Sequence, residues 1–244
     1  MDSLAETRVA DFDPFKKAGF MLKVYSMEAE NQNLLIEGAK TFGIALDEKA
    51  MEAFDLYLKE LLKWNQKINL TAIRSEKGIV LKHFLDSLSV RPYLPDHSFI
   101  LDIGSGAGFP GIPLKIIQPS FEVTLIDSVR KKVDFQRHII RMLGLRGTEA
   151  IHGRVQDRGI LQRLQGRFDI VLSRAFSDLR TFLSLSSPFL KQEGTVVAMK
   201  GEVDPNEMRL LAGAEGIPYR LQKTIPLTLP FSSFKRTILL FEES

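Results

Sequence analysis

The chain has 244 residues, of which 44% are hydrophobic and 26% charged, the composition of an ordinary globular protein with a sizeable core. No apolar run approaches the roughly 20 residues that cross a bilayer, no secretory signal opens the chain, and the absence of cysteine excludes disulfides, thiolate metal sites and a cysteine nucleophile. The net charge of +3 is too small to indicate a class of binding partner. We expect a monomeric, cytoplasmic protein with no metal site and no membrane partner.

The first part of the chain divides into an extension and a helical segment. Residues 1–32 mix charged and apolar positions without a sustained period, and we expect a poorly ordered or loosely helical extension. Residues 33–95 have a helical pattern, in which Asp47 is the predicted N-cap of an amphipathic helix. The apolar positions of that helix recur every three or four residues: Met51, Phe54, Leu58, Leu61 and Leu62. The apolar stripe predicts packing of this segment on the body formed by residues 96–244.

The stretch from Phe99 to Gly111 predicts a buried strand, a glycine turn and the start of a helix. Asp102 lies near the end of the apolar strand, and three alternating glycines follow: Gly104, Gly106 and Gly108. Glycine permits a tight turn and a close approach of the backbone to a ligand. We expect the amides of this turn to face a ligand at the carboxyl end of the strand.

The spacing of the turn bears on the class of cofactor. A dinucleotide-binding turn, G-x-G-x-x-G/A, needs Gly or Ala at position 109, which is Phe109 here. The observed G-x-G-x-G spacing resembles motif I of S-adenosylmethionine-dependent methyltransferases. Asp127 follows the next strand, about twenty residues on, where a Rossmann-type site holds ribose hydroxyls. A nicotinamide-dependent oxidoreductase on the same topology remains the alternative.

The rest of the chain alternates strands and helices. Strands are predicted near 99–103, 122–126, 148–152, 168–173, 193–200, 217–225 and 235–242, and helices near 110–118, 129–143, 156–165, 178–190 and 205–214. This order predicts a doubly wound, Rossmann-like α/β sheet of seven strands, whose last two strands form an antiparallel pair at one edge.

Four further positions fall at the carboxyl ends of these strands. Val155 and Gln156 suit the face and the edge of an adenine ring, although they also suit a plain helix N-terminus. Arg174 follows the fourth strand and Lys200 ends the fifth. For Arg174 the structural alternative is a buried ion pair with a carboxylate.

The string from Ser173 to Phe176 bears on the acceptor. It lacks the Asp/Asn-Pro-Pro-aromatic pattern that holds an exocyclic amine, and the chain has no cysteine for covalent base methylation. An acceptor with a free lone pair, such as guanine N7, is favoured. Arg174 would orient the methionine end of the cofactor or hold guanine O6, and Phe176 would stack on an extruded base.

Basic residues are concentrated in the second half of the chain. Between Asp127 and Arg180 there are twelve Lys and Arg against six Asp and Glu. We interpret this stretch, including Arg130, Lys131 and Arg137, as an Arg-rich face that binds RNA phosphates. Solvated helix faces are the alternative.

Taken together, these motifs resemble the RsmG/GidB family of bacterial methyltransferases. The resemblance covers residues 33–243 and rests on these strings: Trp64-Asn65 through Asn69-Leu70-Thr71, His83-x-Leu85-Asp86-Ser87, Asp102 to Gly111, Asp127-Ser128, Ser173-Arg174-Ala175 and Lys200-Gly201. It implies a class I methyltransferase fold, S-adenosylmethionine as methyl donor, and transfer to guanine N7 in 16S ribosomal RNA of the small subunit.

The resemblance also implies roles for single residues. The cofactor contacts of the family fall on Gly104, Phe109, Val155, Gln156 and Arg174, and we expect His83 and Lys200 to contact RNA. Gln156 stands where the family often has Glu, and Phe109 where Leu is common. The alternative outside enzymes is a ribosome-assembly module that binds RNA without catalysis.

Overall fold

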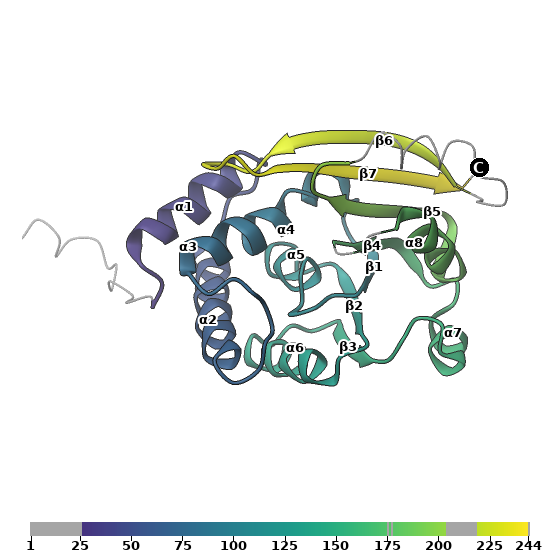
Figure 1. Cartoon of the computed structure of the whole chain (residues 1–244), viewed down its shortest axis with the longest axis horizontal. Coiled ribbons are helices and arrows are strands. Elements are labelled where there is room, and N and C mark those ends of the chain that lie inside the picture. The colour runs from purple at the N-terminus through teal and green to yellow at the C-terminus, as the bar shows by residue number, and fades with distance from the viewer. Residues whose placement is uncertain (1–25, 175, 177, 204–218, 244) are drawn as a thin grey trace, which may run out of the picture.

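The computed structural model describes residues 26–174, 176, 178–203 and 219–243, and its centre is a seven-stranded mixed sheet (Figure 1). The strands are β1 (Phe99–Ile103), β2 (Glu122–Asp127), β3 (Thr148–His152), β4 (Phe168–Ser173), β5 (Leu190–Lys200), β6 (Tyr219–Thr228) and β7 (Lys235–Glu243). The helices are α1 (Ala29–Lys40), α2 (Glu48–Asn65), α3 (Glu76–Ile79), α4 (Asp86–Leu88), α5 (Gly111–Ile117), α6 (Arg130–Met142), α7 (Arg158–Leu164) and α8 (Leu179–Ser186). Short helical turns are η1 (Val80–Leu85), η2 (Arg91–Tyr93) and η3 (Ser187–Phe189).

The strand order is β3-β2-β1-β4-β5-β7-β6. Strands β1 to β5 are parallel, and β7 and β6 join the β5 edge as an antiparallel pair. The predicted Rossmann-like fold is therefore confirmed. The order of the strands reverses between β1 and β4, the switch point where ligands bind in such sheets.

The boundaries differ from the prediction mainly at the start of the chain. Helix α1 begins at Ala29, inside the predicted extension, while residues 1–25 and the helix predicted near 205–214 lie outside the described residues. Helix α2 begins after Asp47, whose Oδ1 accepts a hydrogen bond from the Ala50 amide at 2.8 Å, as a helix N-cap does. In the described part of the chain, no helix combines the length and the apolar character needed to cross a membrane.

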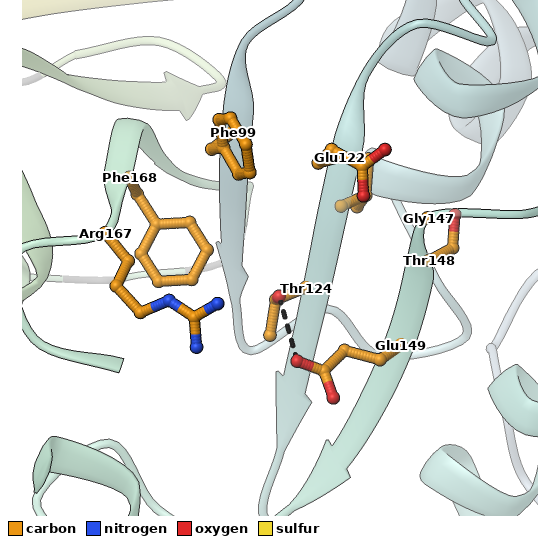
Figure 2. Close-up of a pocket in the computed structure, with 9 residues that line it drawn as sticks. Phe99, Glu122, Thr124, Gly147, Thr148, Glu149, Arg167 and Phe168 are labelled. Carbon is orange, nitrogen blue, oxygen red and sulfur yellow. Dashed lines mark hydrogen bonds between the residues drawn. The ribbon is translucent and has the colours of Figure 1, made fainter. Parts of the chain in front are cut away.

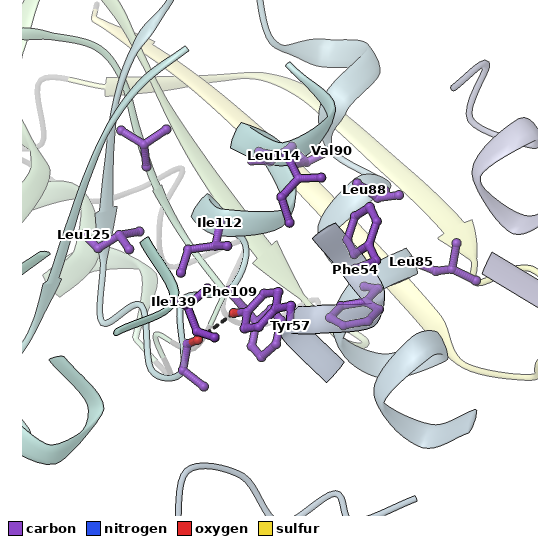
Figure 3. Packing of buried hydrophobic residues seen from close by; sticks show 14 of the residues in the cluster. Phe54, Tyr57, Leu85, Leu88, Val90, Phe109, Ile112, Leu114, Leu125 and Ile139 are labelled. Atoms are coloured by element: carbon purple, nitrogen blue, oxygen red, sulfur yellow. Dashed lines mark hydrogen bonds between the residues drawn. The ribbon is translucent and has the colours of Figure 1, made fainter. Parts of the chain in front are cut away.

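The two faces of the sheet are covered by different helices. Helices α1 to α6 share one core with one face, in which Tyr57 of α2 lies beside Phe109 and Ile112 below the glycine turn (Figure 3). Helices α7 and α8 cover the other face through residues such as Ile160 and Phe182. The amphipathic stripe of α2 is thus buried against the α/β body.

This arrangement corrects one prediction. The Arg-rich stretch from Arg130 to Arg180 runs through α6 on one face of the sheet and α7 on the other. It therefore does not form one continuous Arg-rich face. The physical reason is the reversal of strand order, since the crossover from β3 to β4 carries its helix to the opposite face.

Candidate active site

A cavity of about 310 Å³ opens at the carboxyl ends of β1, β2 and β3. Five of the residues predicted for the site line it: Gly104, Asp127, Val155, Gln156 and Phe176. The remaining lining residues were given no role in the site by the sequence analysis, although Ile103 and Ser128 belong to its motifs: Ile103, Ile126, Ser128, Gly153, Arg154 and Leu185. Ser128 and Gly153 directly follow β2 and β3, so strand ends are the signal that finds them.

The three glycines of the turn have different surroundings. All have positive φ angles, of 70°, 61° and 101° for Gly104, Gly106 and Gly108. A Cβ atom added to Gly104 or Gly106 meets nothing within 4 Å, whereas on Gly108 it would lie 2.4 Å from Cδ1 of Ile112 and 2.9 Å from the hydroxyl of Tyr57. The first two glycines leave open space for a ligand, and the third permits close packing on the core.

Five amides of the turn donate hydrogen bonds within the protein, where the sequence analysis expected them to face a ligand. Those of Gly104 and Ser105 donate to the Ile126 carbonyl, and those of Gly108 and Phe109 donate to the Ser105 carbonyl. The Gly106 amide donates to Oδ2 of Asp127 at 2.8 Å. These hydrogen bonds hold the turn rigid from within, and Gly104 and Gly106 leave open space on its other side.

Asp127 fixes the floor of the cavity from β2. It is buried, and its Oδ1 accepts the amide of Val129 at 2.8 Å while Oδ2 accepts the amide of Gly106. A carboxylate oxygen has more than one lone pair, so Asp127 can also accept a ribose hydroxyl. On the opposite wall Val155 is buried and Gln156 is exposed. This agrees with the predicted contacts of Val155 with the face, and of Gln156 with the edge, of an adenine ring.

Arg174 directly follows β4, the neighbour of β1 at the switch point of the sheet, and is not one of the residues that line the cavity. Its Nη1 donates to the Lys82 carbonyl at 3.0 Å and lies 3.5 Å from Oδ2 of Asp86. The guanidinium lies 5.1 Å from the ring centre of Phe109. Burial lowers the pKa of Arg174, and the facing carboxyl groups, Asp86 first, act in the opposite direction. The ion pair considered as the structural alternative for Arg174 is present, so this cation is fixed rather than mobile.

His83 lies behind Arg174 and not in the cavity. Its Nδ1 is 3.0 Å from Nη2 of Arg174, and its Nε2 is 2.7 Å from Oγ1 of Thr71. Because a guanidinium only donates, we assign the proton of His83 to Nε2 and the acceptor role to Nδ1. Burial and the charge of Arg174 lower the pKa of His83 to about 3. A neutral His83 therefore positions Arg174, and its buried ring stacks on Phe109 at 4.4 Å.

Two buried groups support the turn from below. Oδ2 of Asp102 accepts the Gly111 amide at 2.9 Å, while its Oδ1 has no hydrogen-bond partner in the described part of the chain. Burial raises the pKa of Asp102 well above its ordinary range. The hydroxyl of Tyr57 donates to the Ala107 carbonyl at 2.6 Å, which joins α2 to the turn. Sequence reasoning missed Tyr57, because its position in the stripe of α2 predicts only core packing.

The residues predicted to contact RNA are dispersed. Arg130 and Lys131 are exposed on α6, and Nε of Arg137 donates to the Ala150 carbonyl at 3.0 Å. Lys200 ends β5 and is one of the groups that lower the pKa of Asp178, the N-cap of α8. Phe176 lines the cavity, and its ring stacks on that of Phe182 with 5.2 Å between the ring centres.

A second hollow, of about 300 Å³, lies at the amino ends of the parallel strands (Figure 2). It is lined by Phe99, Glu122, Val123, Thr124, Gly147, Thr148, Glu149, Arg167 and Phe168. One of its two carboxylates is already engaged, since Glu149 pairs with Arg163 and accepts the Thr124 hydroxyl at 3.4 Å. None of the predicted site residues lines it.

Comparison with known proteins gives concordant matches. The sequence model of the family described as rRNA small subunit methyltransferase G (GidB) matches residues 50–233. The chain is 42% identical to the ribosomal RNA small subunit methyltransferase G of Geobacter metallireducens, over 87% of this chain and 96% of that protein. It is 36% identical to the protein of the same name from Acetivibrio thermocellus, over 88% and 90%.

Solved structures with much lower sequence identity share the fold. A SAM-dependent methyltransferase from Aquifex aeolicus superposes with a TM-score of 0.52 at 17% identity, covering 67% of this chain and 92% of that one. The M. jannaschii protein TYW2, solved in complex with AdoMet, gives a TM-score of 0.50 at 18% identity, covering 65% and 77%.

Proposed function

The chain belongs to the rRNA small subunit methyltransferase G family, and we propose that it transfers a methyl group from S-adenosylmethionine to N7 of a guanine in 16S ribosomal RNA. The observation that carries the proposal is the cavity at the carboxyl ends of β1 to β3, together with Arg174, which is fixed by hydrogen bonds directly after the neighbouring strand β4. The family assignment removes the two alternatives, a nicotinamide-dependent oxidoreductase and a non-catalytic assembly module.

The cavity suits the methyl donor in size and in chemistry. Its volume of about 310 Å³ is of the order found for small-molecule sites, and its lining combines apolar walls with few polar groups. Gly104 lines the cavity, and the open space beside it leaves room that a side chain would fill. We assign the adenine to Val155 and Gln156, the ribose to Asp127, and the methionine end to the side of Gly104 and Arg174.

The residues around Arg174 favour catalysis by positioning. When bound, S-adenosylmethionine supplies an electrophilic methyl group, which a ring nitrogen with a free lone pair accepts without losing a proton. No general base is then required, which agrees with a neutral His83 whose ring nitrogens are both engaged. Arg174 presents a fixed positive charge and holds either guanine O6 or the methionine carboxylate.

The proposed acceptor also indicates the compartment in which the enzyme acts. The acceptor is ribosomal RNA of the small subunit, so the enzyme acts in the cytoplasm, where ribosomes are assembled. We propose that one copy of the chain is sufficient, because every residue assigned to the cavity and to the Arg174 network comes from a single chain.

Methyl transfer to ribosomal subunits tests the proposal. Small subunits that lack native modification are incubated with the protein and radiolabelled S-adenosylmethionine, then treated with borohydride and aniline, which cleave RNA at 7-methylguanosine. A single primer-extension stop in 16S RNA is the expected result. Label without cleavage would replace N7 by another acceptor atom, and no label in subunits or naked RNA would contradict the proposed substrate.

A further inference from the structure

Asp86 lies between two arginines from distant parts of the chain. Its Oδ1 accepts a hydrogen bond from Nε of Arg236 at 2.9 Å, and its Oδ2 lies 3.5 Å from Nη1 of Arg174. The Asp86 side chain is 4% exposed, while those of Arg174 and Arg236 are 20% and 22% exposed. One carboxylate thus faces two guanidinium groups, which leaves an uncompensated positive charge at the edge of the protein surface.

Arg236 has a hydrogen-bond donor that the described residues do not use. Its Nε is used by Asp86, and its Nη1 donates to the Lys235 carbonyl at 2.8 Å. Its Nη2 makes no hydrogen bond to any residue that the structure describes. A guanidinium held rigidly on one side, with an unused donor on the other, is suited to an anion with several acceptor oxygens.

A second cation lies over an aromatic ring of the turn between β6 and β7, the turn that leads into Arg236. Nζ of Lys82, the residue before His83, lies 4.2 Å from the ring centre of Phe234. Over the described ranges of the chain, Lys82 forms no ion pair with a carboxylate. Phe231, in the turn between β6 and β7, is 63% exposed. A cation over a half-buried ring, with an exposed ring in the same turn, is a combination suited to single-stranded RNA, through phosphate contact and stacking.

The sheet register places this cluster at the catalytic end. Lys200, the last residue of β5, pairs with Thr237 of β7, so the start of β7 lies at the carboxyl ends of the parallel strands. The cofactor cavity occupies β1 to β3, and Arg236 and Phe231 lie on the far side of Arg174, next to β5. An acceptor nucleotide that reaches Arg174 from this side would carry its backbone over the cluster.

We propose that Arg236, Lys82 and Phe231 bind the sugar–phosphate backbone of the substrate RNA next to the target nucleotide, with Asp86 fixing Arg236 relative to Arg174. The inference rests on the proposed function and adds the surface that holds the RNA. It also replaces the Arg-rich stretch of α6 and α7 as the main contact, since that stretch is divided between two faces.

Substitutions in the cluster test this proposal against a matched control. Lys82→Gln removes a cation from above Phe234, and Lys191→Gln removes one that lies 4.4 Å from the ring centre of Phe99, at the opposite end of the sheet. Binding to unmethylated small subunits is measured between 50 and 200 mM salt, together with kcat, KM and the Kd for S-adenosylhomocysteine.

We expect Lys82→Gln to raise KM for subunits about fivefold to tenfold, to leave kcat and the S-adenosylhomocysteine Kd unchanged, and to reduce the slope of log K against log salt by about 0.7 to 0.9. Phe231→Ala should raise KM without changing the salt slope, because stacking releases no counterions. Arg236→Gln should combine a lower slope with a lower kcat, and Arg236→Lys should restore the slope but only part of kcat. Lys191→Gln should match the wild type.

Two outcomes separate the site from the function. If the wild type methylates small subunits while Lys82→Gln and Phe231→Ala both bind them with wild-type affinity and salt slope, the cluster is not the RNA site and the function stands. If the wild type transfers no methyl group to small subunits, the proposed function fails and this inference fails with it. Because Lys82 and Phe231 are not core residues, the test does not depend on whether Arg236→Gln folds.

Discussion

The two ends of the parallel sheet contain similar residues and differ in chemistry. Each end has a hollow of about 300 Å³, and at each a lysine lies over a phenylalanine ring, Lys191 over Phe99 at the amino end and Lys82 over Phe234 at the carboxyl end. At the amino end the charges are exposed and paired, as in Arg163 with Glu149. At the carboxyl end the buried carboxylate of Asp86 is shared by two half-buried arginines, Arg174 and Arg236.

The difference shows that cavity size and residue type do not identify a site. The hollow at the amino end is equally large, but its ion pairs are solvated and its glycine, Gly147, packs against Glu122. At the carboxyl end Gly104 is open, and burial shifts the pKa values of His83, Asp86 and Arg174 away from their ordinary values. Shifted ionisable groups next to open backbone distinguish a functional site.

Neutralising one carboxylate at each end of the sheet should give the largest difference in the free energy of unfolding. Asp86→Asn leaves two half-buried arginines without a counter-ion, and we expect it to lower the free energy of unfolding by about 3 kcal/mol or more. Asp169→Asn, which breaks the more exposed pair with Lys191, should cost less than about 1 kcal/mol. Urea denaturation measures both, and equal losses would contradict the contrast between the ends.

A matched pair of glycine substitutions sharpens the comparison. Gly104 and Gly166 have positive φ angles of 70° and 63°, and an added Cβ meets no atom within 4 Å in either case. Valine should therefore strain both positions similarly, by about 1–3 kcal/mol. Only Gly104→Val fills the cavity mouth, so we expect a loss of S-adenosylhomocysteine affinity of about 100-fold or more by calorimetry, with none for Gly166→Val. Normal binding by Gly104→Val would show that the cofactor site is misplaced.

Acid should destabilise the carboxyl end through His83. Its pKa of about 3 in the folded protein lies below the ordinary value of 6.5, so the unfolded chain binds more protons between these values. The contribution of His83 to stability is therefore complete above pH 6.5 and is lost as the pH falls towards 3. Between pH 7 and pH 5 we expect a loss of about 2 kcal/mol that His83→Gln abolishes. An unchanged pH slope in His83→Gln, measured by denaturation at both pH values, would contradict a neutral buried imidazole.

The smallest effect is expected at the surface of the amino end. Glu149→Gln breaks the exposed pair with Arg163 and should change the free energy of unfolding by less than about 1 kcal/mol, because solvent screens both charges. Methyl transfer should be unaffected. A marked loss of activity in this variant would indicate that the hollow at the amino end takes part in function.

The sequence predicted the fold, and it also predicted several residues that the structure brings together around one cavity. Strand ends and glycine spacing located Gly104, Asp127, Val155 and Gln156, because in a parallel sheet the residues that follow each strand meet at one edge. The network around Arg174 was not predictable in the same way. Asp86 and Arg236 are 150 positions apart in the chain, and only the packing of α4 against β7 brings them together. The direction of the loop amides was also missed, since it depends on hydrogen bonds within the turn.

The most direct test of the account is amide hydrogen exchange with and without S-adenosylhomocysteine. If the chemistry is confined to the carboxyl end, ligand should slow exchange in the segments 103–108, 126–129 and 153–156, and leave 122–124, 147–149 and 166–168 unchanged. Protection of the second group with no change in the first would place the ligand in the hollow at the amino end and contradict the account.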